Sequence, residues 1–278
     1  MNAADRSGSF IKVTRLSFTA KEFSTLPLQE RLFFVRLAHA YNDLRHIQQL
    51  VVRAIGSTRR YKGIEQEIAS HQMLYGLRQW YAALNEGWKI LRSSWGKDGL
   101  GKKFYPKLTI GKEAYDFLNR YFSNRNLIRK VRDRFAYHYE SDYLVRLLRE
   151  LTPESELHFI TTQYSGNIFY NAAENIQNLA LIAAAGEELG LTESTSWTEG
   201  VARQAIRRLY DEVCRISEKF NELCNDILPV ILKQCTLQRT ALRSSAVSDP
   251  ETCDSIIFVG EEAIIRRRRG DSTKAECQ

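Results

Sequence analysis

Arg132 and His138 are the residues whose types and spacing best fit chemistry on a phosphate group. Both lie in residues 124–139, which run N-R-N-L-I-R-K-V-R-D-R-F-A-Y-H-Y. A guanidinium can pair with two phosphate oxygens at once, and an imidazole with an ordinary pKa of about 6.5 can transfer protons near neutral pH. These two side chains are the predicted catalytic pair.

The helix that must carry these residues has one apolar face. Apolar residues recur in steps of three and four, so on a helix that turns about 100° per residue they form one stripe. The stripe residues are Ile128, Val131, Phe135 and Tyr139. Arg132 and His138 flank the stripe, roughly 120° apart and about 9 Å apart along the axis. One phosphate can meet both only if another element packs over the stripe, and a second copy of this helix would do so.

The segment R-D-R-F-A-Y-H-Y resembles the Arg-x5-His signature of the HEPN superfamily. This resemblance covers the motif and an all-helical setting, not the whole chain. It implies an α-helical bundle that dimerises around the motif helix and, for many members, ribonuclease activity without a metal or another cofactor. By position, Arg132 matches the motif arginine, Asp133 the polar residue beside it and His138 the motif histidine. The resemblance therefore adds Asp133 to the predicted catalytic residues, where it would orient Arg132 or the substrate. The alternative is an ordinary amphipathic helix with a basic outer face and a histidine near its C-terminal end, where a cation suits the helix dipole.

The charge distribution is typical of a protein that binds a polyanion. The formal net charge is +7 and the sequence pI is about 9.1. Between residues 120 and 139 the one acidic residue is Asp133, and the basic residues are Arg120, Arg125, Arg129, Lys130, Arg132 and Arg134. Of these, Arg125, Arg129, Lys130 and Arg134 are the predicted RNA-binding residues, and neighbouring aromatic rings could stack on unpaired bases. The alternative is a solvated basic face balanced by acidic surface elsewhere.

A second polar set, His39, Asp43 and His46, lies on one face of the first predicted long helix. The spacing of i, i+4 and i+7 places these side chains on consecutive turns, where two imidazoles and a carboxylate can converge on a zinc or another divalent ion. They could equally form a patch in which Asp43 holds the histidines by hydrogen bonds. No fourth ligand is evident, and the resemblance to the HEPN superfamily does not require a metal.

Two main functions are consistent with these residues. The first is a HEPN-like, metal-independent endoribonuclease, of a toxin or phage-defence type, which cleaves RNA by attack of the ribose 2′-hydroxyl. Its expected partners are RNA, a second copy of the chain and an antitoxin or regulatory protein. The second is a non-catalytic helical dimer module that binds RNA or protein. A third, weaker hypothesis makes the His39 set the metal site of a helical enzyme.

Composition indicates a globular protein. The chain has 278 residues, of which 44% are hydrophobic and 26% charged, so it can bury a sizeable core. It has no apolar run long enough to span a membrane and no signal segment at its polar N-terminus, and its five cysteines are dispersed without a C-x-x-C pair. We expect a soluble cytoplasmic protein with no membrane association.

The expected fold class is all-α, an elongated helical bundle with one β-hairpin and a disordered tail. Residues 1–25 are predicted to be an N-terminal arm, with an edge strand or extended piece near residues 10–18. Residues 26–240 are predicted to be the helical domain, and residues 241–278 a disordered basic tail. Long helices are expected from about residue 26 to residue 55, from 63 to 95, and from 197 to 234. The first of these has two apolar stripes and should be covered on both faces. Shorter helices are expected near 112–122 and 172–185, and Leu179 should face inward in the second of these. In the helix at 197–234, an apolar stripe from Val201 to Val230 should pack against partners.

Two other stretches carry specific predictions. Residues 96–103, G-K-D-G-L-G-K-K, satisfy the first seven positions of a phosphate-binding P-loop, but Lys103 stands where a Ser or Thr should hold magnesium, and a helix precedes the segment instead of a strand. We predict a flexible basic loop that ends near Gly111. Residues 157–170 contain β-branched and aromatic residues around Ser165, Gly166 and Asn167, which predicts the β-hairpin.

Overall fold

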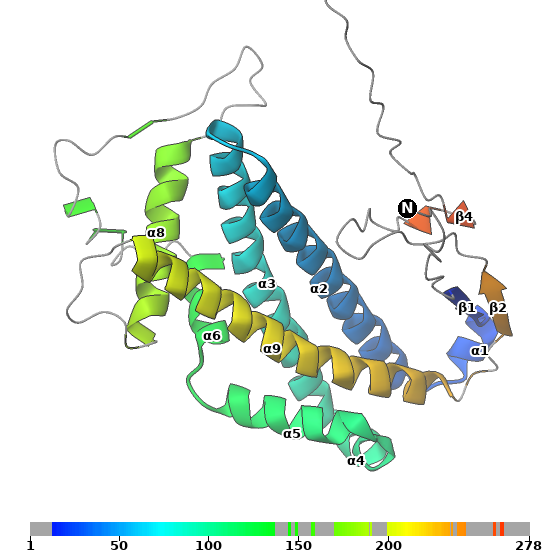
Figure 1. Cartoon of the computed structure of the whole chain (residues 1–278). Helices are drawn as coiled ribbons and strands as arrows, with labels where there is room; N and C mark the ends of the chain where they lie inside the picture. The colour runs from blue at the N-terminus through cyan, green and yellow to red at the C-terminus, as the bar shows by residue number, and fades with distance from the viewer. Residues whose placement is uncertain are drawn as a thin grey trace, which may run out of the picture. The chain divides into compact units, whose positions relative to one another are not determined.

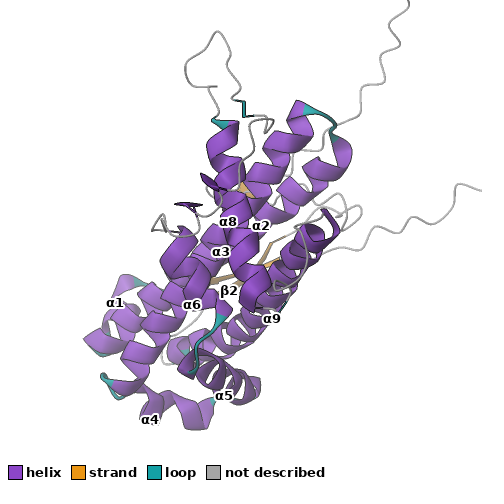
Figure 2. Ribbon diagram, turned by 90° about the vertical axis from the view of Figure 1, so that its left-hand side faces the viewer, coloured by secondary structure: helices purple, strands orange, loops and turns teal. Residues whose placement is uncertain are grey.

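The computed structural model describes residues 13–136, 144–145, 148–149, 157–158, 170–188, 190, 199–233, 235, 238–242, 258–259 and 262–263. The described part of the chain is mostly helical (Figure 2), as the sequence predicted. Most of the β-hairpin predicted at residues 157–170, including its turn, and most of the tail predicted at residues 241–278 lie outside the described residues. None of the helices in the described part is long and apolar enough to cross a membrane.

The chain divides into two compact units, one formed by Met1–Phe23 with Cys235–Gln278 and the other by Ser24–Gln234. In the first unit, β1 (Val13–Ser17) pairs antiparallel with β2 (Gln238–Leu242), so that Val13 lies opposite Leu242. Residues 13–17 of the N-terminal arm thus form a strand, which was one of the two alternatives, and the boundary predicted at residue 240 falls inside β2. A short second ladder joins β3 (Phe258–Val259) to β4 (Glu262–Ala263). The short helix α1 (Ala20–Ser24) begins after Thr19.

The second unit begins with a hairpin of two long helices, α2 (Leu28–Arg60) and α3 (Ile64–Gly96). They pack side by side along their length (Figure 1). The connection turns at Gly63, whose positive φ of 61° favours glycine. We expected α2 to end before Gly56, but it continues to Arg60, because an exposed glycine costs a helix only about 1 kcal/mol.

The two apolar stripes of α2 have different environments. Phe33, Leu37, Leu44 and Val51 are at most 1% exposed and form the contact with the bundle. The opposite stripe was predicted to be covered as well, and that prediction is wrong for the described residues. Its members are between 53% and 64% exposed, and they are Leu28, Leu32, Val35 and Leu50.

The stretch predicted as a basic loop is mostly helical. It contains α4 (Leu100–Phe104) and the 3₁₀ turn η1 (Tyr105–Lys107), and α5 (Ile110–Ser123) follows. Gly101 lies so close to Trp95 that a Cβ atom would stand 2.6 Å from the indole Cδ1. This glycine therefore serves the packing of α4 against α3. Asp226 fixes the start of α5 by accepting hydrogen bonds from the backbone N–H groups of Thr109 (2.6 Å) and Gly111 (2.9 Å).

Two further helices complete this unit, α8 (Asn171–Glu188) and α9 (Glu199–Leu232). In Figure 1, α9 runs across α2 and α3 and then lies beside α5. Its predicted stripe is buried from Ala205 to Val230, and the Tyr81 hydroxyl of α3 donates to the Leu209 carbonyl at 2.7 Å. On α8 we expected Leu179 to face inward, but it is 45% exposed, and Asn178 is buried instead.

Candidate functional site

The motif helix differs from the continuous α-helix that we expected. It begins as α6 (Leu127–Val131), capped by the Asn126 side chain, which accepts from the Arg129 backbone N–H at 2.9 Å. At Arg132 the hydrogen-bonding pattern changes to a π-helix, η2 (Arg132–Ala136). A π turn holds more residues than an α turn, so the offset of about 120° between Arg132 and His138 does not apply. His138 itself lies outside the described residues.

The apolar stripe of this helix is buried within the single chain. Ile128, Val131 and Phe135 are at most 3% exposed, and both α6 and η2 pack against α3. The amphipathic pattern was therefore right, but the expected covering element was wrong. A second copy of the helix cannot pack over this stripe, because α3 of the same chain already occupies it.

Arg132 lies on the flank of that buried stripe, with its side chain 22% exposed. Its Nε and Nη2 atoms donate to one carboxylate oxygen of Glu86, on α3, at 3.0 and 2.8 Å. Its Nη1 atom donates to Asp133 Oδ1 at 2.8 Å. The hydrogen bond from Asp133, together with Glu86, raises the pKa of Arg132 above its ordinary value. The guanidinium is thus held between two carboxylates, one local and one from another helix.

Glu86 is the member of this site that the sequence analysis missed. Its Oε1 atom also accepts from Lys89 Nζ at 2.9 Å, and its side chain is 41% exposed. Burial by itself would raise the pKa of Glu86, but Lys89 and Arg132 lower it below the ordinary value. The sequence offered one signal for Glu86, because it is an acidic residue within the largely apolar stretch around Leu84 and Trp88. That signal does not say which cation the residue meets.

The four predicted RNA-binding residues have different surroundings. Arg125 and Arg129 are exposed, and Arg134 is partly exposed. Lys130 is buried (9% exposed), and its Nζ atom donates to the carbonyl of Ala184 at 3.3 Å, near the C-terminal end of α8. A cation there stabilises the helix end, so Lys130 serves the fold and is not presented to a polyanion.

Arg125 lines a hollow of about 460 Å³ between the start of α6 and α9. Arg208 and Arg215 of α9 also line it, together with Asp211 and Glu212. The two carboxylates offset part of the positive charge. This hollow is therefore a mixed-charge surface next to the motif helix and not a purely cationic one.

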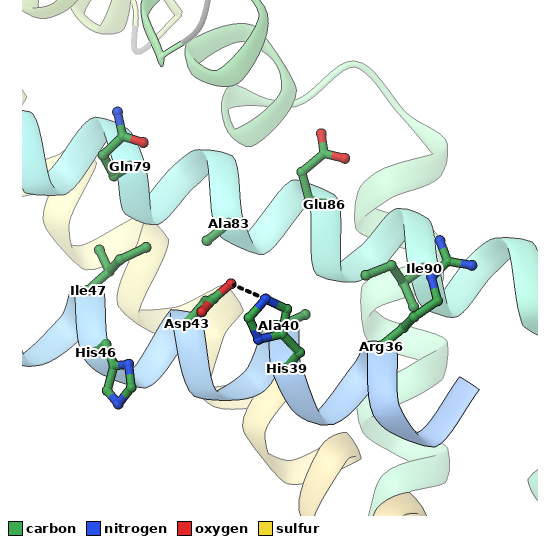
Figure 3. A pocket seen from close by; sticks show the side chains of 10 residues that line it. All are labelled: Arg36, His39, Ala40, Asp43, His46, Ile47, Gln79, Ala83, Glu86 and Ile90. Atoms are coloured by element: carbon green, nitrogen blue, oxygen red, sulfur yellow. Dashed lines mark ion pairs between the residues drawn. The ribbon is translucent and has the colours of Figure 1, made fainter. Parts of the chain in front are cut away.

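The set His39, Asp43 and His46 does not form a metal site in the described part of the chain. His39 Nε2 lies 3.5 Å from Asp43 Oδ2, and the His39 side chain is 75% exposed. Figure 3 shows the His46 ring pointing away from Asp43. No group of three or more His, Cys, Asp or Glu side chains among the described residues is arranged to hold a metal ion. This arrangement agrees better with the polar-patch alternative.

A second polar cluster, also missed from the sequence, lies between α3 and α8. His71 is 5% and Asn178 is 4% exposed, and Asn178 Nδ2 lies 2.9 Å from His71 Nδ1. Asn171 reaches Glu67, and its Nδ2 atom lies 2.7 Å from His158 Nε2. Burial lowers the pKa of the His71 imidazole. The spacing of i and i+7 between Asn171 and Asn178 was the available signal for a polar face on α8.

Comparisons of the chain with protein-family models, with curated proteins and with solved structures found no match.

Proposed function

We propose that this chain is a metal-independent endoribonuclease of the HEPN type, in which Arg132 binds the scissile phosphate and His138 transfers protons. The observation that supports this most directly is the position of Arg132. It is fixed between Glu86 and Asp133 and remains partly exposed at the start of a π turn. Single π turns within helices occur frequently at functional sites.

The reaction needs three groups. A base takes the proton of the ribose 2′-hydroxyl as that oxygen attacks phosphorus, and an acid protonates the leaving 5′-oxygen as the P–O5′ bond breaks. The products carry 2′,3′-cyclic phosphate and 5′-hydroxyl ends. His138 suits the proton transfers, and the Arg132 guanidinium suits the negative charge that develops on the phosphorane oxygens.

The carboxylates beside Arg132 have a role in this scheme. They hold the guanidinium at the flank of the motif helix until RNA arrives. When Arg132 turns toward a phosphate, Lys89 remains as a cation for Glu86, which limits the cost of breaking the Arg132–Glu86 contact. Exposed Arg125 and Arg129 supply non-specific attraction for the strand.

The test is incubation of the purified chain with mixed RNA in EDTA, followed by detection of 2′,3′-cyclic phosphate ends. Arg132→Ala and His138→Ala should each abolish cleavage while the circular dichroism spectrum and Tm stay close to wild type. Arg59→Ala, which removes an exposed arginine from the last turn of α2, is the matched control and should cleave normally. Unchanged cleavage in both site variants removes the catalytic assignment.

A non-catalytic module that binds RNA or protein is the second candidate. It is favoured by the same geometry, because a guanidinium paired with two carboxylates also suits a structural role. In that case wild-type protein leaves RNA intact in EDTA. An RNA-binding module then retards RNA on a native gel, whereas a protein-binding module leaves its mobility unchanged and binds a protein partner.

A dimer remains part of the proposal, but with a different interface from the one expected. The motif stripe is covered by α3, so the contact between two copies must use other surfaces. Light scattering of the purified chain measures the oligomeric state. A toxin or defence role, with an antitoxin or regulator as partner, predicts that expression in bacterial cells arrests growth for wild type and not for Arg132→Ala.

A further inference from the structure

A groove of about 490 Å³ runs between α2 and α3 on the side of the hairpin that carries Glu86 (Figure 3). The two helices contribute facing rows of residues spaced three or four apart, as expected for an antiparallel pair. In Figure 3, Ile90 lies beside Arg36 at one end, and Gln79 lies beside Ile47 at the other. The volume falls within the range of about 300–1,000 Å³ that is usual for small-molecule sites.

The floor of the groove is apolar, and its central side chains are small. Ala40 of α2 and Ala83 of α3 line its middle, and Ile47 and Ile90 line its two ends. Larger residues at the two alanine positions would fill the space between the helices. The floor therefore offers aliphatic contact to a flat group.

Hydrogen-bonding groups of both kinds surround this floor. Arg36 supplies donors, Asp43 and Glu86 supply acceptors, and Gln79 supplies both. A purely anionic ligand would meet the two carboxylates, and a purely cationic ligand would meet Arg36. A flat heterocycle whose edge carries both donors and acceptors fits this set, and a nucleobase is such a group.

The groove adjoins the motif arginine. Glu86 lines the groove and accepts hydrogen bonds from Arg132 Nε and Nη2, at 3.0 Å for Nε, and Lys89 contacts the same carboxylate. A nucleotide whose base lies in the groove thus has two cations, Arg132 and Lys89, next to the wall that Glu86 forms. This juxtaposition of an apolar floor, a mixed polar rim and cations next to one wall distinguishes the groove from the mixed-charge hollow beside Arg125.

We infer that the α2–α3 groove is a binding subsite for one base of single-stranded RNA, next to the nucleotide whose phosphate meets Arg132. This inference rests on the proposed function and extends it, because it names the surface that selects the base beside the cut. The apolar floor contacts the face of the base, while Gln79, Asp43 and Arg36 contact its edge.

Two variants test the groove directly. Ala83→Leu fills the floor, and Gln79→Leu removes a polar group from the rim. Gln49→Leu places the same substitution on an exposed position of α2 that does not line the groove, so it is the matched control. The probes are fluorescein-labelled octamers of adenylate, uridylate and cytidylate, measured by anisotropy, and the four nucleoside monophosphates, measured by calorimetry.

Loss of the contact with one base should weaken octamer binding by about tenfold in Ala83→Leu and in Gln79→Leu, with Gln49→Leu close to wild type. The order of preference among the octamers should also flatten in both groove variants. If wild type cleaves RNA with dependence on Arg132 while both groove variants keep its affinities and cut-site preference, the groove inference is overturned and the proposed function stands.

The converse failure is also distinguishable. If wild type cleaves no RNA but binds a nucleoside monophosphate that Ala83→Leu no longer binds, the groove is a nucleotide site and the ribonuclease proposal fails. If wild type binds neither octamers nor monophosphates at millimolar concentration, the groove inference is overturned. Unchanged Tm in Ala83→Leu shows that lost binding does not reflect unfolding.

Discussion

Two polar clusters lie along α3, and they differ in burial and in the kind of partner they use. Toward the N-terminal end, His71 meets Asn178 of α8, and both are at most 5% exposed. Toward the C-terminal half, Glu86 meets Arg132 with side chains 41% and 22% exposed. The first pairs neutral groups, whereas the second pairs full charges at the edge of a groove.

This difference separates a cluster that holds the fold together from one that can exchange partners. A buried polar group must keep its hydrogen bond, because burying it without a partner costs about 1–3 kcal/mol. A partly exposed ion pair contributes little to stability and can open toward a ligand. We therefore expect changes at Arg132 to affect activity, and changes at Asn178 to affect stability.

Even a conservative change at the exposed cluster, Arg132→Lys, should have a large effect on activity. The substitution keeps the charge but loses the planar fork, so it should lower the rate of RNA cleavage by on the order of tenfold to hundredfold, less than removal of a donor group altogether. The free energy of unfolding should change by less than about 1 kcal/mol, since the pair is partly exposed. Single-turnover cleavage and urea unfolding measure the two quantities. If the loss of cleavage is accompanied by a loss of unfolding free energy large enough to account for it, Arg132 has a structural role.

The largest effect on stability should come from Asn178→Ala. It removes the partner of the buried His71 Nδ1 and should lower the free energy of unfolding by about 1–3 kcal/mol. Asn119→Ala, at an exposed position of α5, is the matched control and should change it by less than about 0.5 kcal/mol. Cleavage by the folded fraction should be unaffected. A fully stable Asn178→Ala protein would mean that the buried cluster does not hold α8.

A smaller effect should appear in the pH dependence of stability. Burial lowers the pKa of His71, while Glu174 and Glu67 oppose the shift and Arg78 adds to it. Between the lowered pKa and about 6.5, the unfolded chain binds more protons than the folded one, so stability rises with pH. The contribution is complete above about pH 6.5 and is lost as pH falls, with a slope of at most about 1.4 kcal/mol per pH unit. Urea unfolding of wild type and His71→Gln at pH 5 to 8 measures it. If the free energy of unfolding has the same slope against pH in wild type and in His71→Gln, another group causes the pH dependence.

The smallest expected effect is a gain, from Glu86→Gln. The Glu86 carboxylate competes with RNA phosphates for Arg132 and Lys89. Without its charge, affinity for single-stranded RNA should rise about twofold to fivefold at low salt, with a steeper salt dependence. Asp98→Asn, near the end of α3, removes an acidic charge elsewhere and is the control. Anisotropy at two salt concentrations measures both variants. Weaker binding in Glu86→Gln would mean that orientation of Arg132 by Glu86 matters more than its charge.

Local periodicity was enough to locate several elements. The apolar spacing placed α3 within one residue of its observed bounds and predicted the stripe of α9. It also identified Ile128, Val131 and Phe135 as the inner face of the motif helix. Such predictions succeed because the residues on one face of a helix are determined by their spacing in the sequence. The same periodicity failed for the second stripe of α2, where an apolar face has no cover among the described residues.

The sequence by itself determined that the chain is mostly helical, which faces are apolar, and that Arg132 and Asp133 are neighbours. Only the tertiary structure decided that α3 covers the motif stripe, that Lys130 is buried while Arg129 is exposed, and that Glu86, 46 positions from Arg132, is its partner. The physical reason is that helix periodicity is a local property, whereas ion pairs and burial depend on which distant segment packs alongside.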